Sequence, residues 1–223
     1  MNLRFVISAN CLCLLIACAA TTISAQALDI SSGGQPTITG TIGGSVTGSA
    51  SVLNNLVVTI NFGEVSPANT NAIVKVVVPI GIRSTQPYQV SVSLAGLGNA
   101  NPQAIQASDI GFGAANIRAM GNQSQVCTLS SHIFYPPFNN DPASTVTIAA
   151  NGRVTYQSSL SNIAGATVIL SGPRLKKTNG QNRGTNDGYI FDAIFAITPQ
   201  FFAAGVSSAT LTFTISAGPN VPC

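Results

Sequence analysis

Charged residues are scarce in this sequence. They make up 7% of its 223 residues, against about 25% in an average soluble domain. Nucleic-acid binding rests on neutralising many phosphates, and a formal net charge of +3 does not supply a basic face on that scale. A chain with so little charge also has little repulsion between its copies. The composition argues against a nucleic-acid partner and suits a protein that assembles or lies on a surface.

Side chains that usually perform catalysis are also few. His132 is the only histidine, and no serine stands in the G-x-S-x-G pattern of a hydrolase nucleophile. A glycosidase needs two facing carboxylates, but Asp187 forms a turn pair with Gly188, and Asp192 alternates with apolar neighbours. We therefore expect a protein that is not an enzyme, with no cofactor and no metal, in which His132 has a structural role.

Residues 1–27 have the layout of a secretory signal peptide. Arg4 precedes an apolar stretch that runs from Phe5 to about Ala20, and Ala25-Gln26-Ala27 fits the small-residue cleavage rule. This pattern predicts export across the inner membrane and a mature chain from Leu28. No later segment offers about 18 uninterrupted apolar residues, so no transmembrane helix is expected in the mature chain.

A second interpretation of the N-terminal segment stays open. Leu15-Ile16-Ala17-Cys18 resembles a lipoprotein cleavage box. In that case Cys18 would be acylated, and the protein would be anchored to the outer membrane by lipid instead of being freely secreted.

Two cysteines remain after the N-terminal segment, which itself holds Cys11, Cys13 and Cys18. Two cysteines in an exported chain most simply form one disulfide, here between Cys127 and Cys223. The alternative is a pair of free thiols. A bridge that closes so long a loop would contribute on the order of 4–5 kcal/mol in the chain-entropy model.

Alternation with a period of two dominates the rest of the chain. Pro and Gly occur at short intervals along this part of the chain, and no stretch shows a helical period. Ala150-Asn151-Gly152 is a hairpin turn signal. Strands with one buried and one wet face are typical of antiparallel sheets, so the sequence predicts an all-β sandwich over residues 53–223. The predicted strands are Ser51–Phe62, Ile73–Arg83, Tyr88–Leu94, Ser144–Ala149, Arg153–Gln157, Ala166–Leu170, Tyr189–Thr198 and Ser208–Ala217.

A β-rich extension over residues 28–52 precedes this domain. From Thr37 to Val52 one parity is apolar or small and the other is rich in hydroxyl groups. A single strand of this length would be far longer than the usual 5–6 residues, and its apolar face could complete the sheet of another subunit. The alternative is two ordinary strands that meet at Gly43-Gly44 and pair within the chain.

Several of these features resemble the fimbrial subunits exported by chaperone–usher systems and the related spore-coat U domains. The resemblance rests on the signal peptide, the alternating N-terminal segment, Asn61-Phe62-Gly63-Glu64-Val65 and the closing strand Ala209–Ile215. It implies an immunoglobulin-like sandwich that lacks one strand, which the N-terminal extension of a neighbour supplies.

The resemblance also implies residue roles. The donor-strand residues would be Ile38, Ile42, Val46, Ala50 and Val52, with Gly40, Gly44 and Gly48 where backbones approach closely. Two features depart from the family pattern. The cysteine pair is Cys127 and Cys223, whereas the family's usual disulfide lies in the N-terminal half, and a tail from Gly218 to Cys223 follows the last strand.

The expected function is that of a structural subunit of a bacterial surface fibre, located at the cell surface or in the periplasm. Its partners would be further copies, other surface subunits and a periplasmic chaperone. The alternative is a monomeric envelope-binding module that acts through its loops. The one cationic cluster could contact anionic surface sugars, although it could equally be a solvated loop; it comprises Arg174, Lys176, Lys177 and Arg183.

Reduction should destabilise the protein if the bridge exists. We expect a strong reductant to lower the melting temperature. Without the bridge, which closes a loop of about 100 residues, the unfolded chain has more conformational entropy and is therefore more favourable. Calorimetry with and without reductant measures the shift. An unchanged melting temperature would show that Cys127 and Cys223 are not bonded.

Overall fold

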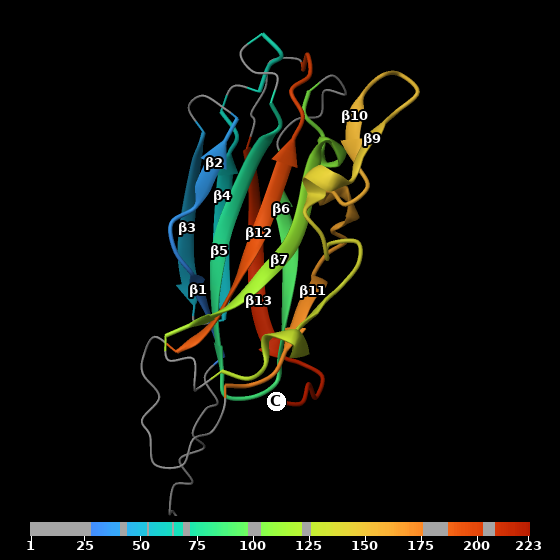
Figure 1. Ribbon diagram of the computed structural model, residues 1–223. Helices are drawn as coiled ribbons and strands as arrows, with labels where there is room; N and C mark the ends of the chain where they lie inside the picture. The colour runs from blue at the N-terminus through green and yellow to red at the C-terminus, as the bar shows by residue number, and fades with distance from the viewer. Residues whose placement is uncertain are drawn as a thin grey trace, which may run out of the picture.

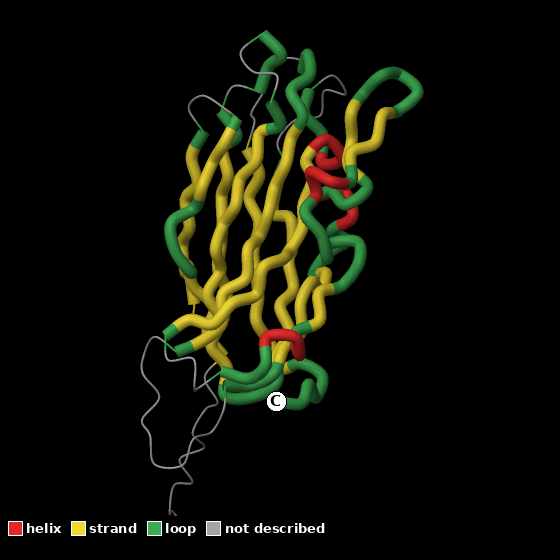
Figure 2. The backbone as a smooth tube through the Cα atoms, viewed as in Figure 1, coloured by secondary structure: helices red, strands yellow, loops and turns green. Residues whose placement is uncertain are grey.

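The computed structural model describes residues 28–40, 44–52, 54–63, 65–68, 72–97, 104–121, 126–175, 187–202 and 208–223. These residues form strands and connecting loops, and the helical segments among them are short 3-10 turns (Figures 1 and 2). The turns are η1 (Ala107–Asp109), η3 (Leu129–Ser131), η4 (Pro142–Ser144) and η5 (Leu160–Asn162). The described residues contain no apolar helix of membrane-spanning length.

Two antiparallel sheets form the body of the molecule. In the five-stranded sheet, β1 (Leu28–Ser32) and β2 (Thr37–Thr39) share one edge of β5 (Val74–Ser84), and β12 (Gly188–Ile197) and β7 (Ile110–Met120) follow. The six-stranded sheet has the order β3 (Ser45–Val52), β4 (Asn55–Asn61), β13 (Ser208–Ala217), β6 (Tyr88–Gly96), β11 (Thr167–Gly172) and β8 (Ile133–Phe134). A separate hairpin of β9 (Val146–Ile148) and β10 (Val154–Tyr156) projects at one end (Figure 1).

Apolar side chains of alternate residues fill the space between the sheets. In β13 the four inward residues Ala209, Leu211, Phe213 and Ile215 are at most 1% exposed, as the alternation predicts. Phe213 meets Phe112 and Phe191 of the opposite sheet, with ring centroids 6.3 and 6.5 Å apart. The prediction of an all-β sandwich is therefore confirmed.

Strand β12 is apolar nearly throughout because both of its faces are covered. Its outward residues Ile194 and Ala196 are 3% and 0% exposed, and they pair with Gly113 and Gly111 of β7. The segment between β8 and β11 packs over these glycines. A Cβ at Gly113 would lie 1.9 Å from the carbonyl oxygen of Asn140, so the covering loop can approach this closely only where β7 carries no side chain.

Two stretches of the chain differ from the strands predicted from the sequence. Residues 51–62 do not form one strand, because Asn54 lies in the turn that ends β3 and begins β4. Strand β7 was not predicted at all. Its sequence, IGFGAANIRAM, is rich in Gly and Ala, which have low strand propensity, and packing rather than propensity holds it in the sheet.

The N-terminal segment supplies strands to both sheets. β1 and β2 pair with β5, whereas β3 pairs with β4, so Thr37–Thr39 and Ser45–Val52 form two strands in different sheets. Ile30 of β1 is 1% exposed and belongs to the common core. Residues 28–40 and 44–52 are therefore part of the sandwich in this structure, as in the alternative of two strands paired within the chain.

Replacing Ile30 by Ala tests whether β1 stabilises the fold. We expect the free energy of unfolding to fall by roughly 2–5 kcal/mol, because the substitution leaves a cavity in the core. Ile73→Ala is the control: Ile73 is 37% exposed, so its truncation should cost much less. Chemical denaturation measures both. Equal losses in the two variants would mean that β1 is not docked in the core.

Candidate functional site

The free edges of the two sheets are the places where another strand could add. Unpaired N–H and C=O groups make such an edge a template for pairing, and proteins usually block it. β8 has only two residues, so its edge is too short to pair with much of an added strand. The edge formed by β1 and β2 is interrupted by residues 33–36, which include Pro36, and β1 carries the charged Asp29.

The edge of β7 is blocked by loops and by a bulge. The amide of Phe112 donates to the carbonyl of Ser158 (3.0 Å), and that of Ala114 donates to the carbonyl of Phe138 (2.7 Å). Beyond this point the register with β12 shifts, and Asn116 has a positive φ of 58°. Bulges of this kind twist an edge away from a partner.

Strand β3 has none of these protections. It is eight residues long, it contains neither proline nor a charged residue, and among the described strands it pairs only with β4. Its edge is therefore the best place in the described structure for a strand of another molecule.

The candidate donor residues lie on β2, on β3 and between them. Ile38 and Val46 are partly buried and pack against the core. The backbones of Ala50 and Val52 pair with Leu56 and Asn55 of β4, whereas Ile42 and the side chains of Ala50 and Val52 lie outside the described residues. The structure thus places Ile38 and Val46 in the sandwich of their own chain.

The three glycines of this segment differ in their surroundings. Gly40 has a φ of +81°, and a Cβ there would lie 2.6 Å from the carbonyl oxygen of Ile73, so a close approach occurs within the chain. Gly48 is exposed, and a Cβ there would meet nothing within 4 Å. Because Gly48 has the same parity as the inward Val46, it leaves open space at the rim of the sandwich. Gly44 is half-buried.

The predicted disulfide joins Cys127 to Cys223, with Cα atoms 5.1 Å apart. The amide of Cys127 donates to the Tyr189 hydroxyl (2.9 Å), which in turn donates to the carbonyl of Arg174 (3.2 Å). The amide of Gly218 donates to the carbonyl of Pro87 (3.0 Å) and fixes the start of the tail. The bridge therefore secures the C-terminal segment at the end of the sandwich opposite the β9–β10 hairpin (Figure 1).

His132 packs against Tyr189, with ring centroids 4.5 Å apart, and its hydrogen bonds define its tautomer. Nδ1 is 3.0 Å from the carbonyl oxygen of Leu129, and Nε2 is 2.9 Å from the hydroxyl of Tyr88. A carbonyl can only accept, so Nδ1 donates and Nε2 of the neutral ring accepts from Tyr88. Burial lowers the pKa of His132 to about 4 and raises the pKa of Tyr88 well above its ordinary value.

The cationic cluster can be placed only in part. Arg174 is exposed at the end of the molecule that holds the disulfide, where it lines a cleft of about 480 Å³ with residues of the tail. Lys176, Lys177 and Arg183 lie outside the described residues.

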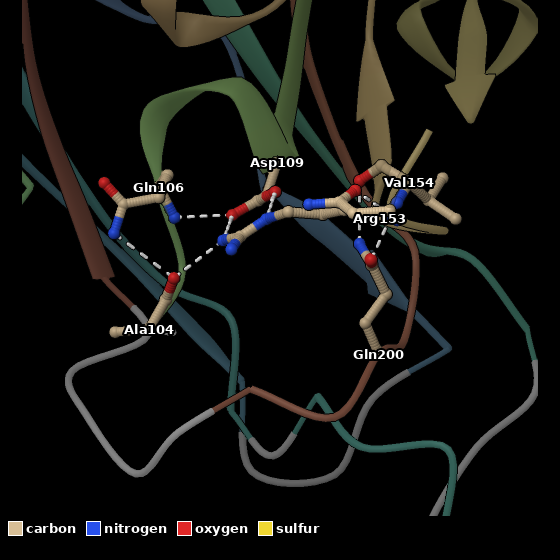
Figure 3. A network of polar contacts seen from close by, with 7 residues as sticks. Ala104, Gln106, Asp109, Arg153, Val154 and Gln200 are labelled. Atoms are coloured by element: carbon tan, nitrogen blue, oxygen red, sulfur yellow. Dashed lines mark hydrogen bonds and ion pairs between the residues drawn. The ribbon is translucent and has the colours of Figure 1, made fainter. Parts of the chain in front are cut away.

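A buried ion pair at the opposite end was not predicted from the sequence. Asp109 is fully buried, and Arg153 donates to both of its carboxylate oxygens, through Nε to Oδ1 (2.7 Å) and through Nη2 to Oδ2, while Nη2 also donates to the carbonyl of Ala104 (2.7 Å) (Figure 3). The hydrogen bonds that Arg153 donates to Asp109 raise the pKa of Arg153. The side-chain amide of Gln200 both donates to and accepts from the backbone of Val154, at 2.7 Å each.

This network joins three segments that are distant in sequence. Asp109 and Arg153 are 44 positions apart, and Gln200 is 46 positions from Val154. In the sequence, only the scarcity of charged residues pointed to such an ion pair. A charged residue that is buried in the fold needs a partner of opposite charge.

Neither metal ligands nor known relatives indicate a function. Within the described residues, no three His, Cys, Asp or Glu side chains come together as a metal ion would require. Comparisons of the chain with protein-family models, curated proteins and solved structures find no match.

Acid should destabilise the fold through His132. Its pKa is about 4 in the folded state and about 6.5 in the unfolded chain, so between these values the unfolded state binds more protons. This contribution is fully present above pH 6.5 and is lost as the pH falls to 4, by up to roughly 3 kcal/mol.

Denaturant titrations across this pH range measure the effect. The variant His132→Gln should be less stable at neutral pH but should lose less stability between pH 6.5 and pH 4. Parallel profiles for the two proteins would show that His132 does not titrate in this way.

Proposed function

We propose that this protein is an exported structural subunit of a bacterial surface fibre or fimbria-like assembly, in which copies join by β-strand complementation. The observation that carries the proposal is the edge of β3, which is long, uncharged and free of proline. The other described edges are short, interrupted or covered. The composition supports it as well, because a chain with 7% charged residues opposes self-association only weakly.

The geometry of β3 suits an added strand. A strand placed beside it would exchange main-chain hydrogen bonds, which supply affinity, and would insert alternate side chains between the sheets, which supply specificity. Gly48 leaves space for such a side chain at the rim, since a Cβ at this residue would have no neighbour within 4 Å. On this proposal the sandwich is immunoglobulin-like and its N-terminal strands form the junction between copies.

The donated strand would come from the N-terminal segment of a neighbour. β1 and β2 lie at an edge and pair only with β5 among the described strands. Exchange of such an element between copies preserves its contacts and is a low-cost route to assembly. A periplasmic chaperone would protect the same edge before assembly, and residues 1–27 would direct export.

A second candidate function has an observation of its own. β1, β2 and β3 already pair with β4 and β5 of the same chain, and this favours a closed, monomeric module that is secreted or lipid-anchored through Cys18. Such a module would act through its loops and would gain nothing from the edge of β3.

Gly48→Asp separates the two candidates. An inward charge on an edge strand blocks pairing, because an added strand would bury it without a partner. The monomer should tolerate the change, since the added side chain enters open space. We expect the wild-type protein to form multimers at high concentration in light scattering and on unheated denaturing gels, and the variant to remain monomeric.

Gly96→Asp is the matched control. Gly96 is also exposed, a Cβ there would also meet nothing within 4 Å, and it lies at the end of β6, an interior strand. This variant should assemble like the wild type. If the wild-type protein stays monomeric at every concentration, or if Gly48→Asp assembles normally, the fibre proposal fails and the monomeric module stands.

A further inference from the structure

A cleft of about 690 Å³ opens at the end of the sandwich from which the β9–β10 hairpin projects. This volume lies within the range of small-molecule sites. Three segments line it, namely Pro67, residues 151–154 and residues 199–202. No residue of β3 is among those that line the cleft, so an inference about it does not depend on assembly.

The floor of the cleft is held in place by the network of Figure 3. Arg153 is fixed by its two bonds to Asp109 and by the carbonyl of Ala104, and Gln200 is fixed against the backbone of Val154. The guanidinium carbon of Arg153 lies over the ring of Phe202, 5.7 Å from the ring centroid. A site whose side chains are already fixed loses little entropy when a ligand binds.

The two charges described at this floor cancel. Among the described residues that line the cleft, Arg153 is the only charged one, and the fully buried Asp109 neutralises it at hydrogen-bond distance. An anion would therefore find no net attraction here, in contrast to a site with an uncompensated arginine. These two charges therefore favour a neutral ligand over an anionic one.

The rim carries an exposed aromatic ring. Phe201 is 87% exposed, the highest value among the large apolar side chains of the described residues. A single exposed ring offers a flat apolar face. The C–H face of a sugar can stack on such a ring while the sugar hydroxyls remain hydrated.

Polar groups suitable for hydroxyls stand beside this ring. The Asn151 Oδ1 accepts from the amide of Arg153 (3.0 Å), and this bond orients the side-chain amide at the turn of the hairpin. The side-chain oxygen of Gln200 accepts one hydrogen bond, from the amide of Val154. An amide oxygen has two lone pairs, so it can accept a second hydrogen bond. We infer that this cleft binds a neutral saccharide, with Phe201 as the stacking surface and Asn151 and Gln200 as hydrogen-bonding groups.

Saturation-transfer NMR and calorimetry with neutral disaccharides test the inference. The probes are cellobiose, lactose, maltose and N,N′-diacetylchitobiose, with sialyllactose as the anionic comparison. We expect at least one neutral probe to bind, with an affinity independent of salt. Phe201→Ala should weaken binding about fivefold to tenfold through loss of stacking, whereas Phe201→Tyr should retain it.

Two controls keep the result specific. Ile133→Ala removes an apolar side chain that is 48% exposed on β8, outside the cleft, and should leave binding unchanged. Gly48→Asp should bind as well as the wild type, since the cleft does not involve β3. The inference is overturned if no neutral probe receives saturation, if Phe201→Ala binds normally, or if only the anionic probe binds and does so in a salt-dependent manner.

Discussion

The contacts of one buried ring, Phe112, hold together the parts on which the rest of the structure depends. Its centroid lies 5.1 Å from Phe195 in the same sheet, 6.3 Å from Phe213 in the opposite sheet and 5.2 Å from Phe138 in the covering segment. Such pairs add to the free energy gained by burying the rings themselves. Both sheets and the segment over β7 are therefore packed around one centre.

Alternation in the sequence was enough to predict much of the fold. β13, β6 and the β9–β10 hairpin follow from period-two patterns and a turn signal, and the disulfide follows from the two cysteines that remain outside the predicted signal peptide. Strand β7 could not be predicted, because its glycines are required by the approach of a loop that comes much later in the chain, such as Asn140 against Gly113. The buried outer face of β12 has the same cause.

The candidate sites were harder to predict than the fold. Sequence pattern identified the segment that contains β3, but it could not show that β3 would be the only long edge left unprotected in the described structure, since this depends on what covers β7. The ion pair of Asp109 and Arg153 was equally hard to predict, because neither residue has a local sequence feature that points to the other. Pairings of this kind depend on tertiary structure and leave no local signal.

The position of β13 has a consequence for the order of events during folding. This strand lies between β4 and β6 at the centre of the six-stranded sheet, yet it follows all the other described strands in sequence. Because a chain is synthesised from its N-terminus, β4 and β6 are made long before β13. This sheet can therefore be completed only after β13 has been made, and during the delay the waiting strands are vulnerable to aggregation unless a holding factor occupies the gap between them.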